Sequence, residues 1–245
     1  MKKISRLSSV VFLMIFTSQI HSQVKFGVKT GLNLATMLDK DSSTIYSKEY
    51  KKKPSLLLGV TGEFPFSDNF SIESGLLFSS KGYKMKDSSA TVSVNLSYFE
   101  IPINAVYNFD LDYIKMTIKA GPYIGAAVKG KAKSNEKVFT DGQGNSVNKV
   151  DLNLGRNKTD FAKQLDYGIS FGLGAEVNSI CFGIQYGLGL ANITTNTENE
   201  NIFKNRVIGI TIGYKFTAPE QTETDGKSNK KYSKKRKSRG KLKKY

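Results

Sequence analysis

Eight segments in which apolar and polar residues alternate with a period of two constrain the fold of this chain more than any other feature. The first segment, VKFGVKTGLNL at 24–34, places Phe26 and Val28 on one face and Gly27 on the other. Seven further segments alternate in the same way, at 55–66, 70–83, 94–109, 113–128, 164–177, 180–191 and 206–216. Successive side chains of a β-strand point to opposite faces, so this pattern predicts eight strands.

The connections between these segments alternate in length. Three are short and polar, at 67–69, 110–112 and 178–179. Four are long, at 35–53, 84–93, 129–163 and 192–205. The alternation predicts an up-and-down antiparallel arrangement with every long loop at one end, which is typical of even-stranded barrels of the bacterial outer membrane.

The chemistry of the two faces separates a membrane barrel from a soluble one. In segment 55–66 one face carries Leu56, Leu58 and Val60, whereas the other carries Gly59 and Glu63. Small and charged residues cannot fill a dry core, but they can line a wet or salt-bridged interior while the bulky face meets lipid. Aromatic residues also cluster beside the short turns, as an interfacial girdle would: Phe64, Phe66, Phe70, Phe109, Tyr113, Tyr214 and Phe216. A soluble, lipocalin-like barrel is the alternative.

The two ends of the chain differ from this body. Residues 1–6 carry three basic side chains, and a short apolar run at 7–16 precedes a small residue, Ser22. This pattern predicts an export signal at 1–22 that is removed near Ser22. We therefore expect a barrel at 23–216 and a basic, disordered tail at 217–245. The one histidine, His21, would leave with the signal, and the one cysteine, Cys181, cannot form an intramolecular disulfide.

Several blocks of the body resemble a known family. They are VKFGVKTGLNLAT, SIESGLLFSSKGYK, SYFEIPINAVYNF, AGPYIGAAV and IGITIGYKF. The chain is similar to the outer-membrane β-barrel family common in Bacteroidetes, whose members are labelled porin-family or PorT-family proteins. The resemblance covers 24–216 and implies an eight-stranded barrel in the outer membrane, but no single activity. It also implies that Phe216 is the closing aromatic read by the barrel-assembly machinery, although here 29 residues follow it.

Ten charged residues share the inward phase of the alternation, five basic and five acidic. They are Lys25, Lys29, Lys115, Lys119 and Lys215, with Glu63, Glu73, Glu100, Asp166 and Glu176. The interior of an eight-stranded barrel is just wide enough for side chains to fill it, and buried charges need partners. We therefore predict a lumen filled by paired charges. A narrow pore for water or small ions is the alternative.

The sequence predicts no catalytic site, cofactor or metal. Ester and peptide hydrolysis by side chains normally requires a base such as histidine, and none remains after export. Cys181 has no histidine to activate it and is expected to be a small filler near the turn at 178–179. The string DGQGN at 141–145 lacks the glutamate that completes an EF-hand loop and is interpreted as a loop tip. The GxG strings lie inside strands without a following helix, which excludes a dinucleotide fingerprint.

The tail carries half of the formal net charge of +16, because eleven basic residues face three acidic ones after Phe216. Its dense basic run comprises Lys230, Lys231, Lys234, Lys235, Arg236, Lys237, Arg239, Lys241, Lys243 and Lys244. Both termini of an even-stranded barrel lie on the short-turn side, which is the periplasm. An exported tail has no nucleic acid to meet there. It either binds an anionic periplasmic surface, peptidoglycan or inner-leaflet lipid, or has no partner.

These observations predict a structural or interaction barrel of the cell envelope, embedded in outer-membrane lipid, with its long loops outside the cell. A narrow passive porin is one alternative. An accessory role in a secretion system is another, and it rests on the family label alone.

Overall fold

The structure is a computed structural model that describes residues 24–40, 50–86, 90–195 and 201–216. The predicted signal at 1–22 and the predicted tail at 217–245 lie outside the described residues. The described residues contain no helix that is long and apolar enough to cross a membrane.

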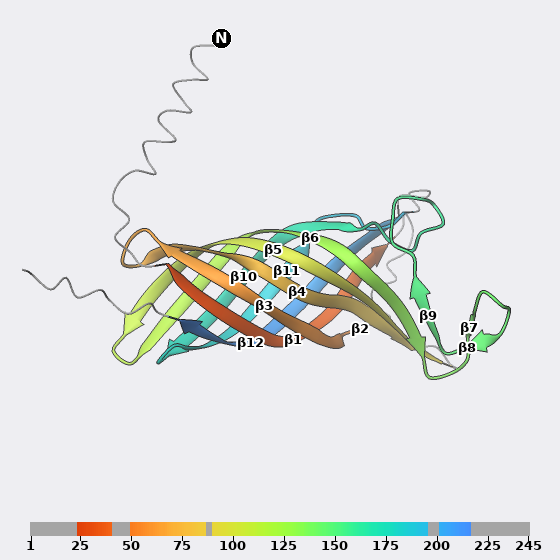
Figure 1. Ribbon diagram of the computed structural model, residues 1–245, viewed down its shortest axis with the longest axis horizontal. Helices are drawn as coiled ribbons and strands as arrows, with labels where there is room; N and C mark the ends of the chain where they lie inside the picture. Colours follow the sequence, from red (N-terminus) through yellow and green to blue (C-terminus); the bar gives the residue numbers. More distant parts are fainter. Residues whose placement is uncertain (1–23, 41–49, 87–89, 196–200, 217–245) are drawn as a thin grey trace, which may run out of the picture.

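Eight long antiparallel strands form a closed ring (Figure 1). In ring order they are β1 (Lys25–Lys40), β3 (Lys53–Pro65), β4 (Phe70–Lys86), β5 (Thr91–Leu111), β6 (Ile114–Ser134), β10 (Leu165–Val177), β11 (Ile180–Gly189) and β12 (Ile202–Phe216). Each strand pairs with its neighbours, β10 pairs with β6, and β12 returns to pair with β1. The predicted all-β, eight-stranded antiparallel up-and-down barrel is confirmed.

The seam between the first and last strands closes the ring. It runs from Phe26 opposite Phe216 to Lys40 opposite Ile202. A sheet with no open edge leaves no row of unpaired backbone groups, which is the condition for strands to cross a bilayer. The seam also places the start of β1 and the end of β12 at the same end of the barrel (Figure 1).

The short turns lie where the sequence predicts them. Asn178 and Ser179, between β10 and β11, both have positive φ, of 49° and 74°. Two consecutive residues of this conformation make the tight hairpin turn whose twist matches that of its strands. Asp112, between β5 and β6, has a φ of 44°.

The long connections are shorter than predicted, because the strands continue into them. β1 extends to Lys40, β6 extends to Ser134, and β12 begins at Ile202. The predicted loop at 84–93 is mostly strand, since β4 ends at Lys86 and β5 starts at Thr91. Four short strands lie in these connections: β2 (Tyr50–Lys51) pairs with β4, β9 (Lys149–Leu152) pairs with β6, and β7 (Phe139–Thr140) pairs with β8 (Ser146–Val147).

Most strands were predicted too short at the loop end because the apolar residues change faces there, as β1 shows. Along most of the barrel, large apolar side chains point outward and stay exposed, as Phe26 (63%) and Leu32 (56%) do on β1. Further along the same strand, Ala35 (0%) and Met37 (1%) point inward and are buried. The period of two continues along the strand, but the apolar side chains move from the outward face to the inward face.

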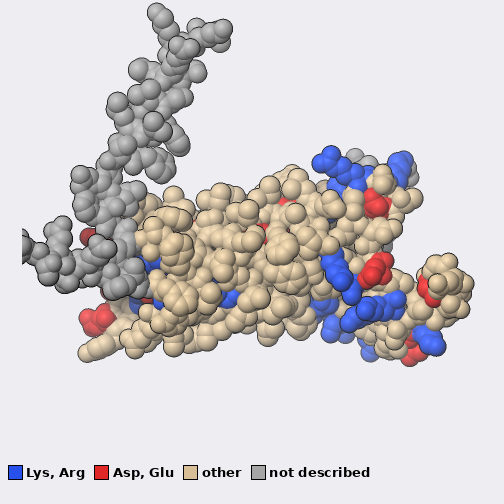
Figure 2. Space-filling model, in the orientation of Figure 1, with Lys and Arg blue, Asp and Glu red and all other residues tan. Residues whose placement is uncertain are grey.

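Two apolar zones result. The outward-facing large apolar side chains of the eight long strands form what we call the apolar wall, and Figure 2 shows it as a mostly uncharged surface between the two ends. The second zone is a buried core inside the loop end of the barrel. Its fully or almost fully buried members are Met37, Tyr83, Val94, Leu96, Tyr98, Ala127, Ala132, Ala162, Ala191 and Ile193.

A substitution at Gly121 on β6 tests how closely neighbouring strands of the barrel pack. A Cβ at this position would lie 1.9 Å from the carbonyl oxygen of Ile103 on β5, which is rigid backbone. We expect Gly121→Val to lower the free energy of unfolding by about 3 kcal/mol. Gly142→Val is the control, because nothing lies within 4 Å of a Cβ there. Urea titration in detergent, followed by the gel band of the unheated, folded protein, measures the unfolding midpoint of both variants. Equal midpoints would contradict the close contact.

Candidate functional site

The interior of the barrel is the candidate site, because ionic and polar side chains from non-adjacent strands meet there. Asn205 on β12 donates to the hydroxyl of Tyr98 on β5 at 3.3 Å, and these two strands lie on opposite sides of the eight-membered ring. Asn33 on β1 donates to Ser79 on β4 at 3.0 Å, two strands away. Such pairs can meet only through the interior.

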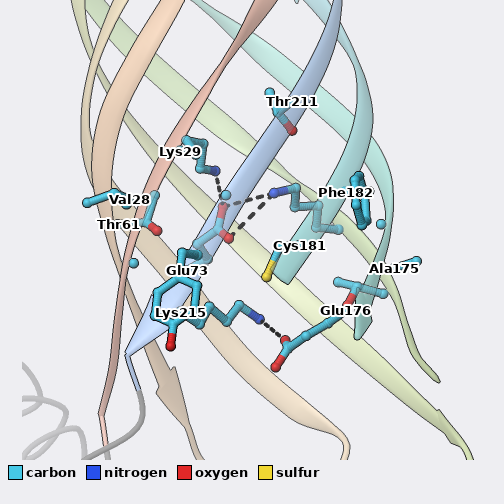
Figure 3. A pocket seen from close by; sticks show the side chains of 16 residues that line it. Val28, Lys29, Thr61, Glu73, Ala175, Glu176, Cys181, Phe182, Thr211 and Lys215 are labelled. Atoms are coloured by element: carbon cyan, nitrogen blue, oxygen red, sulfur yellow. Dashed lines mark hydrogen bonds and ion pairs between the residues drawn. The ribbon is translucent and has the colours of Figure 1, made fainter. Parts of the chain in front are cut away.

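The middle ionic cluster centres on Glu73 of β4. Its Oε1 accepts from the ammonium groups of Lys29 on β1 and Lys119 on β6, each at 3.1 Å (Figure 3). Asn104 on β5 adds a weaker contact at 3.5 Å. One carboxylate is thus held between two lysines that come from opposite directions, and all three side chains are largely buried.

The second cluster lies nearer the short turns and centres on Lys215 of β12. Its ammonium group contacts Glu63 on β3 at 2.7 Å and Glu176 on β10 at 2.8 Å. Ser71 and Asn108 donate further hydrogen bonds to Glu63, at 2.7 and 3.3 Å. Each buried carboxylate in this cluster therefore has a cationic partner.

The third cluster lies toward the loop end and centres on Lys81 of β4. Its ammonium group is paired with Glu100 on β5 and with Asp166 on β10, the latter at 2.9 Å. The rings of Tyr98 and Tyr123 also face this ammonium group, at 5.0 and 4.4 Å from their centroids. Lys81 and Asp166 are 4% and 0% exposed at their side chains, so this is the most deeply buried ion pair of the described residues.

The structure brings together eight of the ten charges predicted to share the lumen. Lys25 lies opposite Glu63 in the register of β1 and β3, but it belongs to none of the three clusters. Lys115 instead pairs with the exposed Asp110 of the neighbouring strand, at 3.4 Å. The predicted balance of five against five is therefore wrong for the clusters themselves, which hold four lysines and five carboxylates.

Lys81 is the main residue that the sequence analysis missed. It follows Glu73 by eight residues in the same strand, so strict alternation places both on the inward face. The polar side chains Asn104 and Asn205 were missed as well. Asparagine on a strand gives no signal of its own, and the same count of residues from a known inward position would have found each of them.

The loop-end core covers the third cluster. Residues 153–163 fold back against β6, where the amide of Ala127 donates to the carbonyl of Gln164 at 2.7 Å. The amide of Lys163 then donates to the carbonyl of Ile193 at 2.7 Å, which joins the connection between β6 and β10 to the one between β11 and β12. Ala162 and Ile193, both 0% exposed, lie in this core.

Little open space remains between the clusters. A cavity of about 60 Å³ lies beside Glu73, Lys119 and Lys215, and another of about 40 Å³ lies beside Asn33 and Glu100. Spaces of this size hold a few water molecules. Waters in the smaller cavity would also satisfy the buried side-chain oxygen of Asn33, which lacks a protein donor.

The chemistry available at the site is limited. Cys181, predicted to be a filler near the turn, is half-buried beside the larger cavity, and its thiol points to the carbonyl of Ser179 at 3.8 Å (Figure 3). The described residues include no histidine and no group of three or more side chains suited to hold a metal ion. Each lumen carboxylate contacts a lysine, which favours a structural arrangement over acid–base chemistry.

Glu73→Gln tests the middle cluster. The change leaves two largely buried ammonium groups without a carboxylate, so we expect the free energy of unfolding to fall by about 3–5 kcal/mol. Asp110→Asn removes a carboxylate from the exposed pair with Lys115 and should cost less than about 1 kcal/mol. Adding Lys29→Met and Lys119→Met to Glu73→Gln should recover part of the loss. Urea midpoints in detergent that are equal for Glu73→Gln and Asp110→Asn would contradict the cluster's role.

Solved structures that the chain resembles include Ail of Yersinia pestis (13% identity, 80% of this chain and 100% of that chain, TM-score 0.39), Neisserial surface protein A (13%, 80% and 98%, 0.39) and outer membrane protein W of Escherichia coli (14%, 80% and 100%, 0.37). No curated protein sequence matches the chain. Residues 17–195 match the family described as outer membrane protein beta-barrel domain. The chain therefore belongs to this family of outer-membrane β-barrel proteins.

Proposed function

We propose that the protein is a closed outer-membrane barrel that serves as a rigid platform, with its loop end presented at the cell surface. The observation that carries this proposal is the set of side-chain contacts across the interior. Three ionic clusters and an apolar core follow one another along the barrel axis, and the described residues leave only small cavities between them.

The pairing of the charges supports a closed lumen over an aqueous one. A channel that conducts ions needs a continuous water-filled path, whereas these lysines and carboxylates meet across the interior and neutralise each other at 2.7–3.1 Å. The apolar core adds a second barrier, because Leu96, Tyr98 and Ile193 are 0% exposed at the loop end. No catalytic step is part of this proposal.

The orientation is part of the proposal. Even-stranded barrels of the outer membrane have short periplasmic turns and longer extracellular loops. The start of β1 and the end of β12 lie at the short-turn end, which would face the periplasm. The strands β7, β8 and β9 belong to the opposite end (Figure 1).

The β7–β8 hairpin at the loop end is held in shape by its own hydrogen bonds and can act as part of a recognition surface. The tip of the β7–β8 hairpin is held by Asp141, whose Oδ1 accepts from the amides of Gln143 and Asn145 at 2.9 and 2.8 Å. The hydrogen bonds from Asn145 hold the pKa of Asp141 below its ordinary value. This agrees with the interpretation of DGQGN as a loop tip. Recognition sites commonly lie on such loops carried by a rigid scaffold.

Conductance separates the platform from the narrow porin. We expect the purified, folded protein to give no stepwise conductance in planar bilayers, because the clusters fill the lumen. A sixteen-stranded porin inserted under the same conditions is the positive control, since barrels of that size leave an aqueous channel. Reproducible unitary steps from the folded protein would favour the porin instead.

The basic tail after Phe216 supports a second, separate proposal. It lies outside the described residues, so the argument rests on its charge alone: eleven basic residues against three acidic ones. We propose that it binds an anionic periplasmic surface, with a gain of roughly 1 kcal/mol per basic residue near that surface.

Removal of residues 217–245 tests the tail. The truncated protein should still fold, but it should lose the salt-sensitive retention by purified cell-wall sacculi that the full chain shows. Co-sedimentation at low and high salt measures the difference. Equal retention of the two forms at low salt would rule out the anchoring role.

A further inference from the structure

The outward face of β6 carries an unusual run of lysines just beyond the apolar wall. In the sequence KGKAK, Lys129, Lys131 and Lys133 alternate with Gly130 and Ala132. Gly130 and Ala132 are buried on the inward side, so the three lysines share the outward side. Residues two apart on a strand are roughly 7 Å from one another, so this edge of β6 presents three closely spaced positive charges.

Lysines on the neighbouring strands extend this run sideways. Lys133 lies directly opposite Lys149 on β9, and Lys84 on β4 lies directly opposite Lys51 on β2. Ser93 on β5 joins the two pairs, since it lies opposite Lys84 on one side and Lys133 on the other. We call the resulting surface the lysine patch, which comprises Lys51, Lys84, Lys129, Lys131, Lys133 and Lys149.

The patch is electrostatically unfavourable for the isolated protein. Like charges directly opposite one another destabilise a sheet, and the patch contains two such pairs. Lys149 and Lys129 lower the pKa of Lys131 below its ordinary value. Burial, followed by repulsion from Lys84 and Lys133, lowers the pKa of the neighbouring Lys53. An anionic partner with several charges would remove this cost.

Few acidic groups of the described residues oppose these charges. Asp151 on β9 approaches Lys131 at 3.9 Å, and its side chain is 77% exposed, so the contact is weak. Lys53 donates to the neutral Asn95. Figure 2 shows that basic side chains gather at this end of the molecule, in contrast to the apolar wall.

The position of the patch identifies the kind of anion. On the short-turn side of the patch, on the same outward face, Ile101 and Phe99 of β5 are 47% and 46% exposed. The ring of Phe99 meets that of Phe78 on β4 edge to face at 5.7 Å, and aromatic residues favour the boundary between membrane and water. On β6, Val128, 53% exposed, directly precedes Lys129. A molecule that covers both surfaces has an acyl part and an anionic head.

We propose that the lysine patch binds the phosphate groups of a multiply phosphorylated glycolipid in the outer leaflet, whose acyl chains lie against the adjoining apolar wall. Lysine binds phosphate as a compact charge with three donors. Lysines spread over several strands fit two or more phosphates better than a single one. The proposal rests on the proposed orientation, in which the loop end faces outward.

Lipid binding by the purified, folded full chain in non-ionic detergent tests the proposal. Native mass spectrometry measures the affinity for lipid A with two phosphates, for lipid A without phosphates, for phosphatidylglycerol and for inorganic pyrophosphate. We expect lipid A with two phosphates to bind most tightly. The triple variant Lys129→Gln, Lys131→Gln, Lys133→Gln should weaken that binding at least about tenfold.

The matched control is Lys40→Gln, Lys163→Gln, Lys204→Gln, which removes the same charge outside the patch. Lys40 and Lys204 lie on β1 and β12, on the other side of the ring. The control should bind lipid A as the unaltered protein does. Migration of the unheated protein on a gel shows whether each variant is folded, and the comparison uses the folded fraction alone.

Three outcomes would overturn the proposal: equal affinity for lipid A and phosphatidylglycerol, equal loss in the two triple variants, or pyrophosphate binding as tight as that of lipid A. The last would mean that the patch binds soluble phosphates and not a lipid. Conductance of the same preparation tests the closed platform separately. A conducting barrel that still binds lipid A would refute the platform and leave the patch, and a closed barrel that fails to bind it would do the reverse.

Discussion

The closed ladder of backbone hydrogen bonds is the constraint on which the rest of this structure depends. Pairing of β12 with β1 from Phe216 to Lys40 removes the last open edge of the sheet, and a strand can cross lipid only when its backbone groups are paired. Closure also fixes which side chains face inward. Every charged residue on that phase is thereby committed to an interior where it must find a partner.

The ionic clusters are the consequence of that commitment. Glu73, Lys81 and Lys215 each sit at the centre of a cluster that joins three strands. Each cluster connects strands that are not neighbours in the ring, as Lys81 on β4 and Asp166 on β10 do. The same contacts use up the charges that a conducting pore would expose to water. In the proposed platform, stability and closure of the lumen therefore have one physical origin.

A change of surroundings along the strands explains the two ends of the molecule. Where the outer face meets lipid, bulky residues point outward. Toward the loop end they point inward, as Met37 and Leu96 do, and lysines take the outward positions. The exchange occurs where Val128 gives way to Lys129 on β6. The apolar core and the lysine patch are thus the two faces of the same segment of wall.

The period of two, the short turns and the excess of small and charged residues on one face were sufficient to predict eight antiparallel strands in a closed barrel. These features act locally, through the alternation of side chains along one strand. They also predicted most of the lumen charges, because the inward phase can be counted along each strand. Most strands were predicted too short at the loop end, since the apolar residues change faces there while the period stays the same.

Only the tertiary structure decided which charges meet. Glu73 lies 44 residues from Lys29, and Asp166 lies 85 residues from Lys81; the distances between such pairs depend on the register and closure of the whole ring. For the same reason the sequence could not show that Lys25 and Lys115 lie outside the three clusters, whereas Lys81 could have been found by counting along β4 from Glu73. The sequence determined which face each residue takes, whereas closure of the barrel determined its partner.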